Sequence, residues 1–343
     1  MKHILFAAGS LALSMLAVSC HKDSGTPDDQ EGNWVIRSEF DGIVRSRAVS
    51  FVVNDTAYVG TGYNRNTYAS QYNFYKYVLT DQTDYWTQIA DFPGTARNSA
   101  VGFNIGSKGY VGTGSDGVNM LKDFWEYNPA TGKWTRKADF GGTARIDATG
   151  FGIGSLGYIT TGFDNNYLKD MWQYDPVADK WTSIISLGGA KRAGAVSFVY
   201  NNKAYIVTGY NNGSPVNDFF VFDPSNTNQP WTELRKITNV DANSTIDDDY
   251  TDIQRQYGVA FVIGTKAYLS TGDNNGSITS KTWCYDFASD SWTRRTSYER
   301  SGRTGAVGFA VKGRGFVGTG KSGSLDFDNF DEFIPTQTYN AND

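Results

Sequence analysis

The sequence predicts an all-β protein, a ring of six four-stranded sheets known as a six-bladed β-propeller. The first observation is an arginine, a phenylalanine six residues later and a Thr-Gly pair ending seventeen residues after the arginine, repeated six times without a register slip. The second is the repeat length, near 48 residues, which suits one blade of four short strands. The six arginines are Arg45, Arg97, Arg145, Arg192, Arg255 and Arg303, and the glycines are Gly62, Gly114, Gly162, Gly209, Gly272 and Gly320.

The third observation is that the two ends of the chain complete each other. The sixth copy has its third strand at 330–335 but no tryptophan after it, whereas Trp34 precedes Arg45 by eleven residues. Four other Trp-to-Arg junctions have this same spacing of eleven. We therefore expect the N-terminal strand to close the last blade, which removes exposed sheet edges and gives six blades rather than five or seven.

The second copy shows how one repeat divides into strands. Residues 100–105 and 108–111 read as a hairpin, and 124–127 and 133–135 read as the third and fourth strands. Turn-forming Gly, Ser, Asn and Pro residues separate them.

Residue size predicts which strand lies at the axis. The position three residues after each arginine is small, because inner strands crowd there, and a large tryptophan on the fourth strand fills the space where blades diverge. The small residues are Ala48, Ala100, Ala148, Ala195, Gly258 and Ala306, and the tryptophans are Trp86, Trp134, Trp181, Trp231 and Trp292.

These repeats resemble Kelch repeats. The segments 58–62 and 110–114 occupy the place of the Kelch double glycine, with threonine replacing the first glycine in all six copies. The pairs Tyr127 and Trp134, and Tyr174 and Trp181, have the spacing of the Kelch family. The resemblance covers about 33–335 and implies a Kelch-type β-propeller of the galactose-oxidase-like superfamily.

The N-terminal residues are typical of a targeting segment. We interpret 1–19 as a lipoprotein signal peptide, Cys20 as the lipidated residue, 20–32 as a polar tether, 33–335 as the propeller and 336–343 as a tail. The segment before Cys20 resembles a bacterial lipoprotein cleavage box, and the tether resembles that of Bacteroidetes lipoproteins. These features imply an outer-membrane lipoprotein of the cell envelope, with surface exposure as one alternative and an ordinary secretory peptide as another.

The composition excludes several classes of function. The net charge of −5 gives no basic footprint for nucleic acid. The two histidines, His3 and His21, precede the propeller, so the copper site of galactose oxidases and histidine-dependent nucleophile schemes have no ligands or base. We expect no cofactor and a monomer.

Two sets of residues are candidates for ligand binding. The six arginines are expected to surround the mouth of the central channel, where guanidinium groups would hold carboxylate or phosphate. The alternative is that each pairs with a carbonyl or with Asp123, Asp170 or Asp218 and only joins strands. Loop residues with amide and aromatic groups suit sugars or peptide backbones, unless they only form turns. They are Tyr63, Asn64, Asn165, Tyr167, Tyr210, Asn211 and Asn274.

One junction, from Trp231 to Arg255, is thirteen residues longer than the others and rich in aspartate. Asp247, Asp249 and Asp252 are a weak candidate for Ca²⁺ binding, and a solvated acidic loop is the alternative. We expect no metal there.

Together these features predict a lipid-anchored binding protein that presents a loop face to a glycan or a protein segment, including an acidic one. No catalytic residues are assigned. The alternative is a carbohydrate-active enzyme similar to the Kelch sialic-acid epimerases, which rests on analogy of fold.

Overall fold

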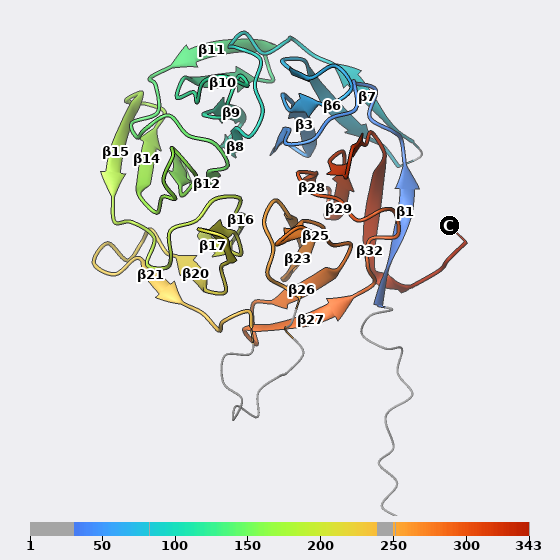
Figure 1. The fold of residues 1–343 in the computed structure, drawn as a ribbon. Helices are drawn as coiled ribbons and strands as arrows, with labels where there is room; N and C mark the ends of the chain where they lie inside the picture. The colour runs from blue at the N-terminus through green and yellow to red at the C-terminus, as the bar shows by residue number, and fades with distance from the viewer. Residues whose placement is uncertain (1–30, 82, 239–249, 251, 343) are drawn as a thin grey trace, which may run out of the picture.

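The computed structural model describes residues 31–81, 83–238, 250 and 252–342, and it shows six four-stranded antiparallel sheets arranged around a central axis (Figure 1). Every regular element in these ranges is a strand. Blade 1 contains β2 (Val49–Val53), β3 (Thr56–Gly60), β6 (Phe74–Leu79) and β7 (Asp84–Gln88). Blade 2 contains β8 (Val101–Ile105), β9 (Lys108–Gly112), β10 (Phe124–Asn128) and β11 (Lys133–Lys137).

Blades 3 to 5 repeat this order from the axis outward. Blade 3 contains β12 (Thr149–Ile153), β13 (Leu156–Thr160), β14 (Met171–Asp175) and β15 (Lys180–Ile184). Blade 4 contains β16 (Val196–Tyr200), β17 (Lys203–Val207), β20 (Phe219–Phe222) and β21 (Trp231–Glu233). Blade 5 contains β22 (Val259–Ile263), β23 (Lys266–Ser270), β26 (Thr282–Asp286) and β27 (Ser291–Arg295).

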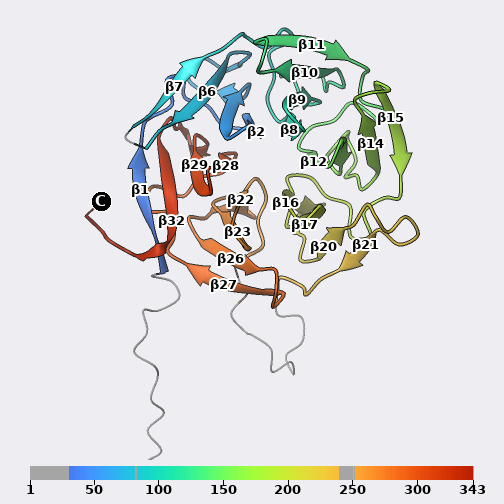
Figure 2. The ribbon, with the colours of Figure 1, turned by 180° about the vertical axis from the view of Figure 1, so that it is seen from behind.

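Blade 6 joins the two ends of the chain, as predicted. It contains β28 (Val307–Val311), β29 (Arg314–Gly318), β32 (Phe330–Thr338) and, outermost, β1 (Glu31–Arg37). β1 pairs antiparallel with β32, with Trp34 opposite Phe333, and both views show the two strands side by side (Figures 1 and 2). The strands extend slightly beyond the limits 33–335 because pairing runs from Glu31 to Thr338.

Aromatic side chains fill the space between blades, as residue size predicted. Trp86 of blade 1 contacts Phe309 of blade 6, with ring centroids 6.5 Å apart, and Trp181 of blade 3 contacts Phe124 of blade 2 at 5.0 Å. Trp34 is 2 % exposed. These tryptophans therefore form the packed core between sheets.

The channel at the axis is lined by the inner strands. Two cavities along it, of about 300 and 280 Å³, are bordered by residues of β2, β8, β12, β16, β22 and β28. Small side chains such as Ala48 and Gly258 lie at one end, where the inner strands begin.

Short hairpins project between the second and third strands of four blades. They are β4 (Tyr63–Asn64) with β5 (Ala69–Ser70), β18 (Tyr210–Asn211) with β19 (Ser214–Pro215), β24 (Asp273–Asn274) with β25 (Ser277–Ile278), and β30 (Lys321–Ser322) with β31 (Leu325–Asp326). Each begins beside the linker that leads into an inner strand, as in the bridge between Ser46 and Tyr63. The hairpins and these linkers thus share one face, here called the loop face.

The signal peptide and tether predicted for 1–32, including Cys20, lie outside the described residues except at their last two positions. No helix in the described part of the chain is long and apolar enough to cross a membrane.

Candidate ligand site at the channel mouth

The structure corrects the expected position of the six repeated arginines. All are buried, with exposed fractions of 0 to 1 %, so none lines the mouth of the channel. In every copy the Nη1 atom donates to the carbonyl oxygen of the threonine sixteen residues later, in the Thr-Gly pair of the same blade. Nε donates to the carbonyl two residues earlier. The arginines therefore join two backbone segments within each blade, the alternative that the sequence left open.

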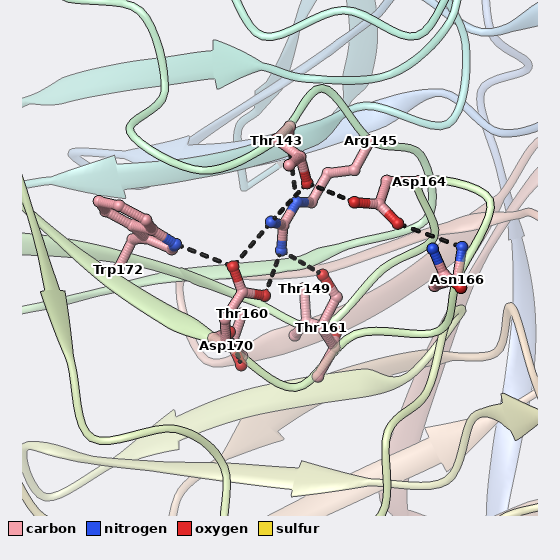
Figure 3. Close-up of polar contacts among 9 residues, drawn as sticks. All are labelled: Thr143, Arg145, Thr149, Thr160, Thr161, Asp164, Asn166, Asp170 and Trp172. Carbon is pink, nitrogen blue, oxygen red and sulfur yellow. Dashed lines mark hydrogen bonds and ion pairs between the residues drawn. The ribbon is translucent and has the colours of Figure 1, made fainter.

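Arg145 shows the arrangement in detail (Figure 3). Its guanidinium group donates to both carboxylate oxygens of Asp170, at 2.6 and 2.8 Å, and to the carbonyl of Thr161 at 3.0 Å. The indole of Trp172 donates to the same carboxylate at 2.9 Å, and the guanidinium carbon lies 4.9 Å from the ring centroid of Phe140. The five donors of arginine fit this set of fixed acceptors, which a lysine could not satisfy.

The aspartate partners named from the sequence are present in three blades. Asp123, Asp170 and Asp218 form ion pairs with Arg97, Arg145 and Arg192. Burial would raise the pKa of Asp170, but the hydrogen bond and charge of Arg145 outweigh it and lower that pKa below its ordinary value. Asp123 has a lowered pKa for the same reason, beside Arg97.

The threonine that replaces the first Kelch glycine adopts a left-handed backbone in all six copies, with φ from 57° to 64°. A β-branched residue is rare there. The arginine bond holds its carbonyl in place, and the following glycine N–H donates to the arginine carbonyl of the next blade. At Gly114, φ is 90° and an added Cβ would lie 2.6 Å from the carbonyl oxygen of Asn98, so glycine is required.

A different set of residues surrounds the channel mouth, one from each blade and each two positions after its arginine. The backbone N–H of each donates to the carbonyl of the preceding blade at 2.7 to 3.1 Å, and the six bonds close a complete ring. All six have φ between 54° and 63°. They are Arg47, Ser99, Asp147, Gly194, Tyr257 and Gly305.

Four of these residues have side chains that connect across the mouth. Arg47 donates to Ser99 Oγ at 3.2 Å, and its guanidinium carbon lies 4.7 Å from the ring centroid of Tyr257. The Tyr257 hydroxyl donates to Asp147 Oδ2 at 3.0 Å. The glycines leave room for these contacts: a Cβ at Gly194 would lie 2.9 Å from the Tyr257 ring.

The surroundings fix the charge states of this network. Burial, followed by the charge of Asp147, raises the pKa of the Tyr257 phenol, so it remains a hydrogen-bond donor. Burial alone would lower the pKa of Arg47, but Asp147 and Tyr257 outweigh it and raise that pKa. The mouth thus presents a permanent cation, a phenol and a carboxylate around a cavity of about 120 Å³.

The predicted loop residues divide into structural and accessible ones. Asn64 is 1 % exposed; its amide donates to the Val44 carbonyl at 2.7 Å and its Oδ1 accepts from Thr67, so it stabilises the hairpin and does not face a ligand. Tyr63 is half-buried on β4. Asn165 is exposed in a turn with φ of 87°.

The remaining loop candidates lie in or beside the projecting hairpins and turns. Tyr167 packs on Phe163 at 5.2 Å between ring centroids. The Tyr210 hydroxyl donates to Asn275 Oδ1 at 2.9 Å. Asn211 and Asn274 are half-buried on β18 and β24.

The acidic insertion before Arg255 gives no metal site among the described residues. Asp252 accepts from the Trp283 indole at 2.8 Å, and its backbone carbonyl accepts from Arg255. Asp247 and Asp249 lie outside the described part of the chain. Nowhere in that part do three His, Cys, Asp or Glu residues gather as metal ligands.

Sequence reasoning missed the ring residues, although a signal was present. The arginine, the small residue three positions later and the phenylalanine recur in every repeat, but the second position after the arginine is occupied by Arg, Ser, Asp, Gly, Tyr and Gly in turn. At this position the backbone has the same conformation in every blade while the side chain differs, so each blade can place a different side chain at the channel mouth.

Comparisons with known proteins agree with this architecture. The model of the Kelch motif matches residues 191–235, which contain blade 4. The solved structure of YjhT superposes with a TM-score of 0.69 over 86 % of this chain and 96 % of its own, at 16 % identity, which shows a shared fold.

A local match points to one curated relative. The N-acetylneuraminate epimerase of Pasteurella multocida (strain Pm70) is 37 % identical over 84 residues. That stretch is 23 % of this chain and spans only 20 % of the epimerase.

Proposed function

We propose that this Kelch-type six-bladed β-propeller is a lipid-anchored binding protein of the cell envelope that holds a glycan at its channel mouth. The observation that carries the proposal is the connected set of Ser99, Arg47, Tyr257 and Asp147 around one cavity. Sugars carry hydroxyl groups that both donate and accept, and this set offers cationic donors, a carboxylate acceptor and an aromatic ring within one small space.

Ligand-induced stabilisation tests the proposal. A panel of neutral glycans, acidic sugars and acidic peptides is added to the protein, and the thermal midpoint is measured. A ligand present at 100 times its Kd stabilises the native state by about 2.7 kcal/mol, so a real ligand gives a clear upward shift.

Two ring variants locate the binding. Asp147→Asn and Tyr257→Phe should each reduce the shift, because the first removes the negative charge and turns one acceptor oxygen into an NH2 donor, and the second removes the hydroxyl donor at the mouth. Tyr85→Phe, on the outer strand β7 and 47 % exposed, is the matched control and should leave it unchanged. A shift of equal size in all three variants would place the ligand elsewhere, and shifts with peptides alone would favour a protein segment.

An epimerase is the second candidate, favoured by the local identity to N-acetylneuraminate epimerase. Asp147 and the Tyr257 phenol are groups that could move a proton to or from a bound sugar. Incubation with N-acetylneuraminate, followed by NMR of its epimers, tests this. Conversion that Asp147→Asn abolishes would establish an enzyme, whereas binding without conversion would leave a binding protein.

The lipid anchor rests on the sequence around Cys20. Metabolic labelling with a fatty acid should label the wild-type chain, and Cys20→Ser should lose both the label and the membrane fraction. Labelling of the serine variant would contradict the anchor at this residue.

A further inference from the structure

Three cations gather on the loop face where blade 6 meets blade 1. Arg47 belongs to the ring at the channel mouth, Arg65 follows β4, and Lys321 begins β30. Lys321 is bonded through its backbone to Thr304, at 3.0 and 2.9 Å, which precedes the ring residue Gly305. The backbone N–H of Arg47 donates to the Gly305 carbonyl at 2.7 Å, so Arg47 lies next to the segment that holds Lys321.

The two hairpins that carry Arg65 and Lys321 are fixed to each other. The backbone N–H of Arg65 donates to Asp326 Oδ2 of β31 at 2.6 Å. Backbone bonds thus fix Lys321 to Thr304 and Arg47 to Gly305, and the Asp326 side chain fixes the backbone of Arg65, so the three residues have defined positions.

The positive charges of this group are left without ion pairs. Within the described ranges, Arg47, Arg65 and Lys321 have no carboxylate oxygen within 4.0 Å of their charged nitrogens, although thirteen other ion pairs are present there. The buried Nε of Arg65 and the buried Oδ1 of Asp326 have no hydrogen-bond partner. Buried polar atoms without partners are uncommon and are normally satisfied by water or by a ligand.

The local electrostatics favour an anion beside Lys321. Burial, followed by the charges of Arg47 and Arg65, lowers the pKa of Lys321, and the opposing charges of Asp326 and Asp273 do not reverse that shift. An anion beside Lys321 would relieve this repulsion. The two nearby carboxylates accept hydrogen bonds from other groups: Asp147 from the Tyr257 hydroxyl, and Asp273 from the backbone N–H of Gly276.

We propose that Arg47, Arg65 and Lys321 form a subsite for an anionic group, a carboxylate or a phosphate, carried by the ligand of the channel mouth. The anion accepts from Arg65 Nε, from Lys321 Nζ and from the free donors of Arg47, and a hydroxyl group next to it on the ligand donates to Asp326 Oδ1. This assignment rests on the proposed function and narrows its ligand to hydroxylated anions.

The test uses inorganic phosphate and acetate as probes on the full chain. Lysines are converted to their dimethyl form with isotope-labelled methyl groups, the Lys321 signal is assigned from Lys321→Gln, and each anion is titrated at constant ionic strength. Both probes should give a saturable shift of this signal and raise the pKa of Lys321. Arg65→Gln and Arg47→Gln should weaken the apparent affinity on the order of tenfold, since each removes a charged donor.

Controls separate a local site from general charge effects. Lys191→Gln removes an exposed lysine next to Arg192 and should leave the titration unchanged. If Arg47→Gln fails to fold, Arg47→Lys replaces it, since this variant keeps the charge but removes the guanidinium donors. No saturable shift with either anion, or equal affinity in the wild type and Arg65→Gln, would overturn the subsite.

The outcome is independent of the glycan test. Neutral sugars that bind equally to the wild type and Lys321→Gln, without any anion effect, would keep the proposed function and refute the subsite. Anion binding at Lys321 without any glycan binding would keep the subsite and refute the proposed glycan-binding function.

Discussion

Replacing Arg145 by methionine distinguishes a structural arginine from a ligand-binding one. The guanidinium group is 1 % exposed and makes five hydrogen bonds, to Thr143, Thr161 and Asp170. Methionine keeps an aliphatic side chain but removes the guanidinium group that lies over Phe140. The Thr161 carbonyl then loses its arginine donor, and the Asp170 carboxylate loses both arginine donors and retains the indole of Trp172.

The expected loss follows from breaking a buried ion pair, which costs about 3–5 kcal/mol when one partner is removed. The Asp170 side chain is 35 % exposed, so water can partly rehydrate it and the lower end of that range applies. We therefore expect Arg145→Met to lower the free energy of unfolding by about 3 kcal/mol. Affinity for any ligand at the channel mouth should change little.

Urea-induced unfolding of the full chain, with ligand titration on the folded protein, measures both quantities. Arg136→Met is the control: its ion pair with Asp139 is 2.7 Å long, but the two side chains are 57 % and 42 % exposed. An exposed pair of this kind contributes little, so we expect no measurable change in stability. Wild-type stability of Arg145→Met together with lost ligand binding would refute the structural role.

The same variant has a pH signature. The pKa of Asp170 is lowered in the folded state, so its contribution to stability is present above the unfolded value of about 3.9 and is lost as pH falls through the folded value. Arg145→Met should therefore lose less stability on acidification below about pH 4 than the wild type does. Parallel acid titrations of the two proteins would contradict this linkage.

Three further predictions concern the frame of the propeller. Gly114→Ala should lower the free energy of unfolding by more than about 2 kcal/mol, because its Cβ would lie 2.6 Å from the carbonyl oxygen of Asn98. Gly117→Ala, with φ of 102° and nothing within 4 Å, should lower it by about 1 kcal/mol. Urea midpoints compare the two variants, and equal losses of stability would show that the close approach at Gly114 is relieved. Trp34→Ala should cost about 3–5 kcal/mol and loosen the closure of blade 6, and full protection of the β32 amides from hydrogen exchange in that variant would contradict its role. Burial, followed by the charge of Tyr127, raises the pKa of Tyr58 to about 12. The neutral Tyr58 phenol therefore contributes fully to stability below about pH 10, and this contribution is lost as pH rises through about 12. Phenolate absorbance should rise together with unfolding, and ionisation of all tyrosines before unfolding would contradict this prediction.

The ring of blades and its closure could be predicted because both depend on spacing alone. Trp34 stands eleven residues before Arg45, the spacing at four other junctions, and the pairing of β1 with β32 follows from it. The Thr-Gly turn was harder to predict. Threonine at φ near 60° contradicts its ordinary preference, and the arginine bond that holds it connects residues sixteen positions apart.

The site was predicted less well because the direction of a side chain at the start of a strand is not visible in the sequence. The sequence alone places an arginine before each inner strand at the channel mouth, and leaves open whether it faces a ligand or pairs with a carbonyl or an aspartate. In the structure each guanidinium group donates to the carbonyl of the Thr-Gly turn, a buried backbone acceptor that would otherwise need another partner. The residue two positions later turns towards the axis, because its left-handed backbone forms the bond to the preceding blade.

This geometry separates the parts of the repeat that build the propeller from the part that can vary. The arginine and the Thr-Gly pair form hydrogen bonds inside and between blades, and the tryptophan packs between them, so changing any of these residues disturbs the ring. The residue two positions after the arginine contributes to the ring only through its backbone, and its side chain is free to differ. Six blades can therefore present Arg47, Ser99, Asp147 and Tyr257 around one cavity, with glycine at the other two positions giving the larger side chains space to meet. An asymmetric binding site thus arises from a nearly symmetric frame, and its specificity is expected to depend on these positions and on the hairpins that flank them.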